Sequence, residues 1–285
     1  MHSIVKQSTF MAGNLARTSF RKVVGAAAAA GYDSITIWPN MWRHALRRDG
    51  LTLDSMRRML EDHKLALTFA EGCTDWIPAA PQGAAGPRND ATRAEYIEVC
   101  AALGGAGIVV AHTTGAPLDY ERDIAAFARA CDEAAAAKVG VALELVGFAA
   151  IRDVHAAKRV VEGAGKPNGG YVIDIGHLIR GGGSIDDVRQ LPAERIHCVQ
   201  VNDGPRAAPA DLVEEVVFGR RLPGDGELDV PAFLKTLGEM GVRASVGAEL
   251  YRRSFEQREA VDVMRELLAA TRHVLAQAGM EPAAA

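Results

Sequence analysis

The feature that most constrains the fold is an alternation of short apolar segments and longer amphipathic segments, repeated about eight times along the 285 residues. The short segments are rich in Val and Ile, as is typical of strands in a parallel sheet that helices cover. The longer segments carry apolar residues at helical spacing. This order predicts an α/β fold built from successive strand–helix units. The predicted strands are 3–9, 34–38, 65–70, 107–111, 140–146, 170–175, 195–201 and 244–249, and the predicted helices are 19–30, 52–64, 90–103, 120–138, 151–163, 184–190, 229–240 and 255–278.

Eight strand–helix units without a strong linker predict one (β/α)8 TIM barrel, with residues 1–285 forming a single domain. Barrels of about 250 residues routinely form one domain, so the length of the chain agrees with this fold. A doubly wound parallel sheet is the alternative. That fold usually carries a glycine-rich phosphate loop after its first strand, whereas the first strand here is followed by "MAGNLART".

The composition limits which binding partners and which cellular compartment we expect for this protein. The net charge is −4 and no basic run stands out, which argues against an electrostatic grip on nucleic acid. The four cysteines are scattered without a C-x-x-C pair, as expected of reduced thiols. The N-terminal "MHSIVKQSTF" lacks the regions of a signal peptide, and "VVGAAAAAGY" is too short to span a bilayer. We therefore expect a cytoplasmic protein that binds neither nucleic acid nor a membrane.

Two predicted loops are long for a compact domain. They cover residues 71–89 and 202–228, and each follows a predicted strand. Loops of this length are usually functional. Because both follow strands, both are expected at the carboxyl end of the barrel, where barrel enzymes keep their active sites.

Oxygen-bearing side chains stand at equivalent places at the ends of the last four predicted strands. They are Glu144, Asp174, Gln200 and Glu249. The residues two positions earlier are small or apolar, so we expect all four side chains to point inward at the mouth of the barrel. Three clustered carboxylates repel one another unless protons or a cation neutralise them, and a divalent metal is the simplest solution. The alternative for each acid is a helix cap or a solvated charge.

These motifs resemble those of the xylose-isomerase-like TIM-barrel superfamily, which includes sugar-phosphate isomerases and epimerases, inosose dehydratases and isomerases, and ketose 3-epimerases. The resemblance covers nearly the whole chain and rests on "LELV", "DIGH", "HCVQVNDG", "GRRLPGDGELD" and "GAEL". It implies that Glu, Asp, His and Glu bind one divalent metal and that the two Glu residues exchange protons with the substrate. Carried over, Glu144 and Glu249 are the catalytic pair and Asp174 is a ligand. The position of the ligand His falls on Gln200, which is a departure from the family pattern.

The amide at position 200 changes the metal that we expect. A Gln side chain still offers its carbonyl oxygen, so the predicted ligands are the four oxygen donors Glu144, Asp174, Gln200 and Glu249. Oxygen-only sites favour hard ions, and we therefore expect Mn²⁺ or Mg²⁺ and not Zn²⁺. His197 lies three residues from Gln200, hence on the opposite strand face, and is expected to be an ordinary half-buried residue.

Four further residues are candidates for substrate binding. The resemblance places His177 near the substrate and implies that Arg220 contacts substrate oxygens, for which a planar guanidinium is suited. His112 and Trp38 fall at the ends of their predicted strands and face the mouth of the barrel. The alternatives are an exposed loop histidine for His177, a solvated side chain on a mobile loop for Arg220, and core packing for the aromatic residue.

This constellation predicts chemistry on a hydroxy-ketone. A bound divalent cation polarises the carbonyl, and a Glu removes the adjacent proton to form an enediolate-like intermediate. The first hypothesis is an isomerase or epimerase of a sugar, keto-polyol or related carbohydrate. The second is a lyase, either an inosose-type dehydratase or an enzyme that eliminates the aglycone of an oxidised glycoside. A non-catalytic ligand-binding barrel remains a further alternative. An AP endonuclease is disfavoured because it needs a basic surface and a His-rich zinc cluster, whereas this chain has a net charge of −4 and eight histidines, few of them at strand ends. The resemblance also implies a homodimer or homotetramer.

Overall fold

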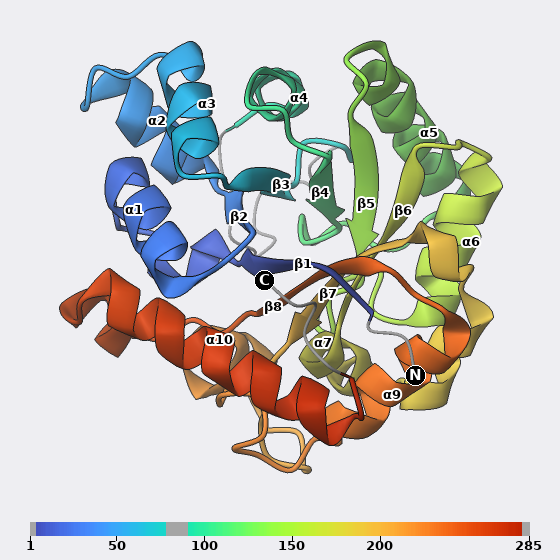
Figure 1. Ribbon diagram of the computed structural model, residues 1–285. Helices are drawn as coiled ribbons and strands as arrows, with labels where there is room; N and C mark the ends of the chain where they lie inside the picture. Colours follow the sequence, from blue (N-terminus) through green and yellow to red (C-terminus); the bar gives the residue numbers. More distant parts are fainter. Residues whose placement is uncertain (1–3, 78–90, 281–285) are drawn as a thin grey trace.

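The eight-strand prediction is confirmed by the computed structural model, which describes residues 4–77 and 91–280 (Figure 1). The described residues form a closed barrel in which each strand pairs in parallel with its neighbours in chain order, and β8 closes on β1. The fold is therefore a (β/α)8 TIM barrel. Its strands are β1 (Val5–Phe10), β2 (Ser34–Ile37), β3 (Ala66–Cys73), β4 (Gly107–Ala111), β5 (Gly140–Glu144), β6 (Gly169–Asp174), β7 (Ile196–Val201) and β8 (Ala244–Ala248).

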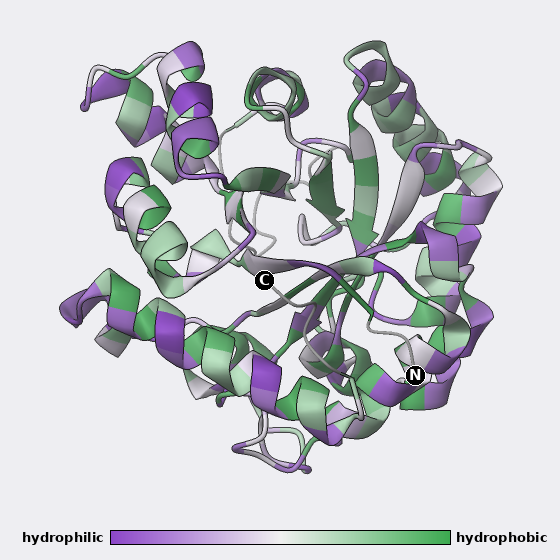
Figure 2. Cartoon of the chain, in the orientation of Figure 1, coloured by the Kyte–Doolittle hydropathy of each residue, from purple (hydrophilic) through white to green (hydrophobic). Residues whose placement is uncertain are grey.

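Helices surround the barrel and turn their apolar sides toward it (Figures 1 and 2). Along α10, the buried residues recur at helical spacing, and polar residues fill the exposed side. Side-chain caps begin several of the helices, such as Thr92 before α4, as the start of a helix requires. The main helices are α1 (Phe20–Ala30), α2 (Pro39–Arg47), α3 (Leu53–Asp62), α4 (Arg93–Ala102), α5 (Tyr120–Ala136), α6 (Val154–Ala164), α7 (Ile175–Arg180), α9 (Val230–Met240) and α10 (Ala260–Gln277).

The structure differs from the predicted helices in three places. Helix α2 was not predicted; it starts at Pro39, whose fixed φ suits a first helical position. Helix α7 begins directly at the end of β6, because the side chain of Asp174 caps it. The predicted helix 184–190 is a 3-10 helix over Ile185–Gln190. None of these differences changes the order of the strands.

The interior of the barrel is a small apolar layer, separate from the larger core between sheet and helices. Its buried members are Met11, Phe69, Val109, Ala142, Val172 and Cys198. Side chains two residues further along a strand lie on the same face and nearer its carboxyl end. Glu144, Asp174 and Gln200 stand two residues after members of this layer, so the predicted inward direction is confirmed for these three strands.

The strand β3 is longer than predicted, and this matters for the site. It runs to Cys73 instead of ending at residue 70, with register shifts against both neighbouring strands. Glu71 therefore belongs to the strand and stands two residues after Phe69 of the interior layer. Of the predicted loop 71–89, residues 78–89 lie outside the described residues.

The loop between β7 and α9 is ordered by one buried carboxylate. Asp203 accepts hydrogen bonds from the backbone N–H groups of Gly204, Gly224 and Leu228, and its own backbone pairs with that of Arg221. The segment between these ends contains the short helix α8 (Leu212–Glu214) and a π-helical turn, Glu215–Gly219. The two ends of this loop are thereby held together above the barrel. Within the described residues, no helix has the length and apolar character needed to cross a bilayer.

Candidate active site

A group of buried acidic side chains gathers at the carboxyl end of the barrel. Glu144 and Asp174 are the last residues of β5 and β6, and Glu249 directly follows β8. Asp174 and Glu249 are fully buried or nearly so, whereas the Glu144 side chain is 14% exposed. Glu144 is therefore the member of these three that a ligand reaches most readily.

Glu71 is a fourth acid in this group, and the sequence reasoning missed it. It is buried, its Oε1 accepts a hydrogen bond from Gln200 Nε2 at 3.3 Å, and its Oε2 accepts one from Trp38 Nε1 at 3.0 Å. The signal was present in the sequence, because the alternation in "LTFAE" places Glu71 on the same strand face as Phe69. Ending the predicted strand at residue 70 hid that alternation.

Arg220 inserts the positive charge of its side chain among the acids. The guanidinium is 3% exposed, and it donates to Asp174 Oδ1 at 3.2 Å and to Glu249 Oε2 at 3.4 Å. It also donates to the backbone carbonyl of Glu249 at 3.1 Å. The structure thus brings Arg220 to the site from the loop, with its donors on the carboxylates instead of in solvent.

His177 and Asn202 surround the carboxylate of Asp174. The backbone N–H of His177 donates to Asp174 Oδ1 at 2.8 Å, and Asn202 Nδ2 donates to Oδ2 at 2.7 Å. The ring Nδ1 of His177 accepts from the backbone N–H of Gly147, which leaves Nε2 as the protonated nitrogen, 3.9 Å from Glu144 Oε1. Burial and the charge of Arg220 lower the pKa of His177 well below its usual value. His177 is therefore a neutral donor beside Glu144.

Burial raises the pKa of all four acids, and repulsion from neighbouring carboxylates raises it further for Glu144 and Glu249. Burial raises the pKa of Glu71 to about 7 against the hydrogen bonds that it accepts, and burial with the charge of Glu71 raises the pKa of Glu249 to about 8. The pKa of Glu144 lies well above its usual value because of burial and the other three charges. The pKa of Asp174 is raised by burial, although Arg220 opposes this effect. One guanidinium does not balance four carboxylates, so the ionised cluster is short of positive charge.

The donor set fits a hard divalent cation in its chemistry. Gln200 Oε1 is buried and has no hydrogen-bond partner among the described residues. An unpaired carbonyl oxygen in such a place is costly unless a ligand completes it. Within the described part of the chain, no group of three His, Cys, Asp or Glu side chains is arranged so that it could hold a metal ion as it stands. The fit therefore rests on the types of donor, the unpaired oxygen and the deficit of positive charge.

Two aromatic side chains line the same end of the barrel. Tyr251 donates its hydroxyl to Glu249 Oε1 at 3.3 Å. Its ring meets that of Trp38 edge to face, with centroids 6.4 Å apart. Trp38, expected from the sequence to contact substrate, is placed beside Glu71. By contrast, Phe10, Trp42 and Trp76 are fully buried in the main core.

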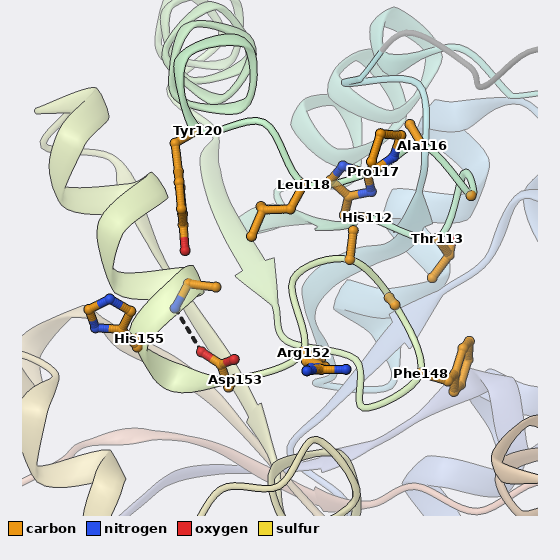
Figure 3. Close-up of a pocket in the computed structure, with 14 residues that line it drawn as sticks. His112, Thr113, Ala116, Pro117, Leu118, Tyr120, Phe148, Arg152, Asp153 and His155 are labelled. Carbon is orange, nitrogen blue, oxygen red and sulfur yellow. Dashed lines mark hydrogen bonds between the residues drawn. The ribbon is translucent and has the colours of Figure 1, made fainter.

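His112 makes its side-chain contacts with a set of groups other than the four acids. Its Nε2 lies 3.5 Å from Asp123 Oδ2 and 3.3 Å from Arg122 Nη2, and its ring meets Trp76 edge to face. Its Nδ1 is buried without a partner among the described residues. His112 belongs instead to the lining of a neighbouring cavity of about 470 Å³ (Figure 3).

This cavity lies between the loop after β4 and the loop after β5. Figure 3 shows Tyr120 and His155 at one end and Phe148 at the other, with Arg152 among the lining side chains. Asp153, the one carboxylate among the described lining residues, caps α6 by accepting from the backbone N–H of Ala156 at 2.8 Å. The Phe148 ring meets that of His177 edge to face, with centroids 5.8 Å apart. The cavity is therefore next to the acid cluster, and its walls combine apolar surface with basic side chains.

His197 is half-buried on the outer face of β7 and packs against Gly170, which confirms its predicted separation from the site. The close approach leaves no room for a side chain at position 170, since a Cβ there would meet the His197 ring and lie 2.6 Å from the backbone carbonyl oxygen of Arg195.

Comparison with known proteins agrees with this architecture. A curated inosose isomerase of Bacillus velezensis is 25% identical over 254 residues, which cover 81% of this chain and 88% of that protein. A 3-dehydroshikimate dehydratase of Pseudomonas aeruginosa is 26% identical over 253 residues, which cover 85% of this chain and 38% of that protein. Among solved structures, an IolI protein with a bound zinc atom superposes with a TM-score of 0.81 at 20% identity, covering 95% of this chain and 98% of that one.

The family itself is shown by a broader match. The sequence profile described as xylose isomerase-like TIM barrel matches residues 24–272, which include every strand from β2 to β8 and all the site residues named above. The curated relatives named above are an isomerase and a dehydratase, so proteins similar to this chain include both classes of enzyme. The chain belongs to the xylose isomerase-like TIM barrel family.

Proposed function

We propose that the protein is a divalent-metal-dependent isomerase or epimerase of a sugar, keto-polyol or related hydroxy-ketone. The observation that carries the proposal is the cluster of four carboxyl groups with raised pKa around the unpaired carbonyl oxygen of Gln200. Glu144, Asp174, Gln200 and Glu249 would hold the metal, and Mn²⁺ or Mg²⁺ suits four oxygen donors best. When bound, such an ion supplies a Lewis acid that polarises a carbonyl and acidifies the adjacent C–H.

Glu144 and Glu249 are the residues that we assign to proton transfer. They belong to strands separated by β6 and β7 in the barrel, so they approach a ligand at its axis from different sides. A carboxyl group with a pKa near 8, as burial gives Glu249, is a stronger base once ionised than an ordinary carboxylate. Return of the proton to the opposite face of the same carbon gives an epimer, and return to the neighbouring carbon gives an isomer.

The other polar side chains would stabilise the oxygen atoms of the substrate. His177 presents a neutral Nε2–H beside Glu144, and Arg220 presents a guanidinium beside Glu249. Both can donate to oxygen atoms that gain negative charge as the C–H proton leaves. The neighbouring cavity would receive the part of the substrate beyond the reacting carbons, with Phe148 between the two spaces.

A lyase is the second candidate, and two observations favour it. One is the cavity, which has room for a substituent larger than a hydroxyl group. The other is the similarity to 3-dehydroshikimate dehydratases, proteins named for the loss of water from a hydroxy-ketone that carries a carboxylate. The same proton abstraction serves this reaction if the electrons of the enediolate expel a β-oxygen group, with the leaving oxygen taking up a proton as water or alcohol.

The common first step gives one test for all of these reactions. Metal-free protein would be supplied with Mn²⁺ or Mg²⁺ in D₂O and mixed in turn with scyllo-inosose, D-fructose and 3-dehydroshikimate. Proton NMR then follows loss of the signal from the C–H next to the carbonyl, and absorbance follows a dehydrated product. We expect metal-dependent exchange with at least one of these compounds. Binding without exchange or product would support the non-catalytic barrel instead.

Two variants test the assignment of the acids. Glu144→Gln and Glu249→Gln should each lower the exchange rate by roughly 100-fold or more, since general acid–base groups contribute about that much. Glu98→Gln, at an exposed position of α4, is the matched control and should keep the wild-type rate. Full exchange in both site variants would remove these residues from the chemistry.

A further inference from the structure

The amide of Gln200 is held in an unequal way by its surroundings. Its Nε2 donates to Glu71 Oε1 at 3.3 Å, whereas its Oε1 is buried without a partner among the described residues. A half-turn of this amide exchanges the positions of its oxygen and its NH₂ group. The hydrogen-bond partner on the nitrogen side, Glu71, therefore determines which of the two points into the site.

Glu71 is itself fixed on its other side. Its Oε2 accepts from Trp38 Nε1 at 3.0 Å, and the hydroxyl of Thr36 also hydrogen-bonds to its carboxylate. The Thr36 hydroxyl oxygen already accepts from the backbone N–H of Ala12 at 2.8 Å, so its proton is free to be donated. With donors from two sides, the carboxylate of Glu71 cannot turn away from Gln200 without losing a buried hydrogen bond.

We propose that Glu71 is a positioning residue that fixes the amide of Gln200, so that the carbonyl oxygen and not the NH₂ group is offered to the metal. A carboxylate accepts hydrogen bonds and donates none, so it selects the NH₂ face of the amide. A reversed amide would set two oxygens against each other and turn its N–H donors toward the other acids. Trp38 then acts through Glu71, as a second positioning residue. The inference rests on the metal site proposed above.

The test uses metal binding in addition to catalysis. Metal-free protein is titrated with Mn²⁺ by calorimetry at a fixed pH of 8, above the pKa of about 7 of Glu71, so that this group is a carboxylate. Glu71→Gln should weaken Mn²⁺ binding by about 10- to 100-fold, the usual effect of losing a residue that orients a ligand. Trp38→Phe should weaken it less, because Thr36 and Gln200 still hold Glu71. Glu98→Gln is the control and should bind like the wild type.

A swap of the two side chains separates positioning from direct ligation. In the double variant Glu71→Gln, Gln200→Glu, the donor and acceptor exchange places and the net charge of the cluster is unchanged. A hydrogen bond between positions 71 and 200 is kept, and an oxygen again faces the site. We expect Mn²⁺ affinity to return to within a few-fold of the wild type. An affinity as low as that of Glu71→Gln alone would show that the carboxylate at position 71 is itself required, which would overturn the inference.

A measurement without metal distinguishes failure of this inference from failure of the proposed function. The side-chain NH₂ resonances of Gln200 in the metal-free protein, identified by their loss in Gln200→Glu, should exchange slowly with water in the wild type and faster in Glu71→Gln. Identical exchange in the two proteins would overturn the positioning role, whatever the metal affinity. Slow exchange lost in the variant supports it, even if the wild type binds no Mn²⁺ and the proposed metal site fails.

Discussion

Arg220 donates to Asp174 Oδ1 at 3.2 Å across 46 residues of sequence, and both side chains are buried. Asp174 belongs to a strand end, and Arg220 belongs to the long loop after β7. The pair therefore joins the barrel to the loop in the middle of the acid cluster. Among the described side chains, the guanidinium of Arg220 supplies positive charge there.

Removing this cation should destabilise the protein. Arg220→Met leaves Asp174 and Glu249 buried without their partner, and breaking a buried pair in this way costs about 3–5 kcal/mol. Urea unfolding of the metal-free protein at pH 8 measures the loss. The control is Arg221→Met, because Arg221 is the exposed neighbour on the same loop. Equal stability of the two variants would mean that the carboxylates do not depend on Arg220.

The metal-free protein should lose stability as the pH rises. The pKa of Glu71 is raised from 4.5 to about 7 and that of Glu249 from 4.5 to about 8, so the folded state holds their protons more tightly than the unfolded chain does. This stabilisation is complete below about pH 4.5 and is lost as the pH passes through 7 and then 8. A tenfold difference in proton affinity between the folded and unfolded states corresponds to about 1.4 kcal/mol.

The pH prediction can be checked by urea unfolding with EDTA between pH 5 and pH 9. Glu249→Gln removes one of the titrating groups with a raised pKa and should give a flatter profile than the wild type. A stability that rises over this range would contradict the raised pKa values. Excess Mn²⁺ should reverse the decline, because the ion binds the ionised carboxylates of the folded state.

The loop that carries Arg220 should depend on a second buried ion pair. Arg180 of α7 meets Glu215 through two hydrogen bonds of 2.7 and 2.6 Å, and it also donates to the carbonyl of Pro205 at 2.6 Å. Glu215→Ala should cost about 3–5 kcal/mol and speed proteolysis within residues 202–228. Glu214→Ala, at the exposed preceding position, should do neither. Unchanged proteolysis of the first variant would show that Asp203 alone suffices to order the loop.

Arg152 should distinguish carboxylate-bearing substrates from neutral ones. It lines the cavity next to the cluster, where the one acidic side chain among the described lining residues is engaged as the cap of α6. Arg152→Ala should raise the KM for 3-dehydroshikimate about tenfold, which equals about 1.4 kcal/mol of binding, and leave that for scyllo-inosose unchanged. Arg129→Ala, exposed on α5, is the control. An equal effect on both compounds would remove Arg152 from the recognition of charge.

The residues at the strand ends could be predicted from the sequence, whereas most of the loop residues that contact them could not. Glu144, Asp174 and Gln200 could be placed because alternation within one strand is local, and the barrel adds only the information that the strands are parallel and adjacent. Glu71 follows the same rule and was missed only because its strand was ended too early. The helix α7 was missed because its six residues are too few to establish a helical period.

The contacts of the loop residues could not be predicted in this way. Arg220 reaches Asp174 because Asp203 and the Arg180–Glu215 pair fold the loop back over the barrel. His112 is drawn to Asp123, on a helix that follows its own strand, and not to the acid cluster. Both outcomes depend on hydrogen bonds between distant residues that leave no periodic trace in the sequence.

The division between strand ends and loop has an evolutionary consequence. The acids are placed by the alternation of side chains along strands that the whole barrel shares, so their positions depend on the barrel and not on the loop. Arg220 is carried on a segment that Asp203 closes at its base, so residues of this segment away from Arg220 and the Arg180–Glu215 pair can change while the barrel stays intact. In such a barrel, the acids at the strand ends can stay the same while a change confined to one loop alters what surrounds them.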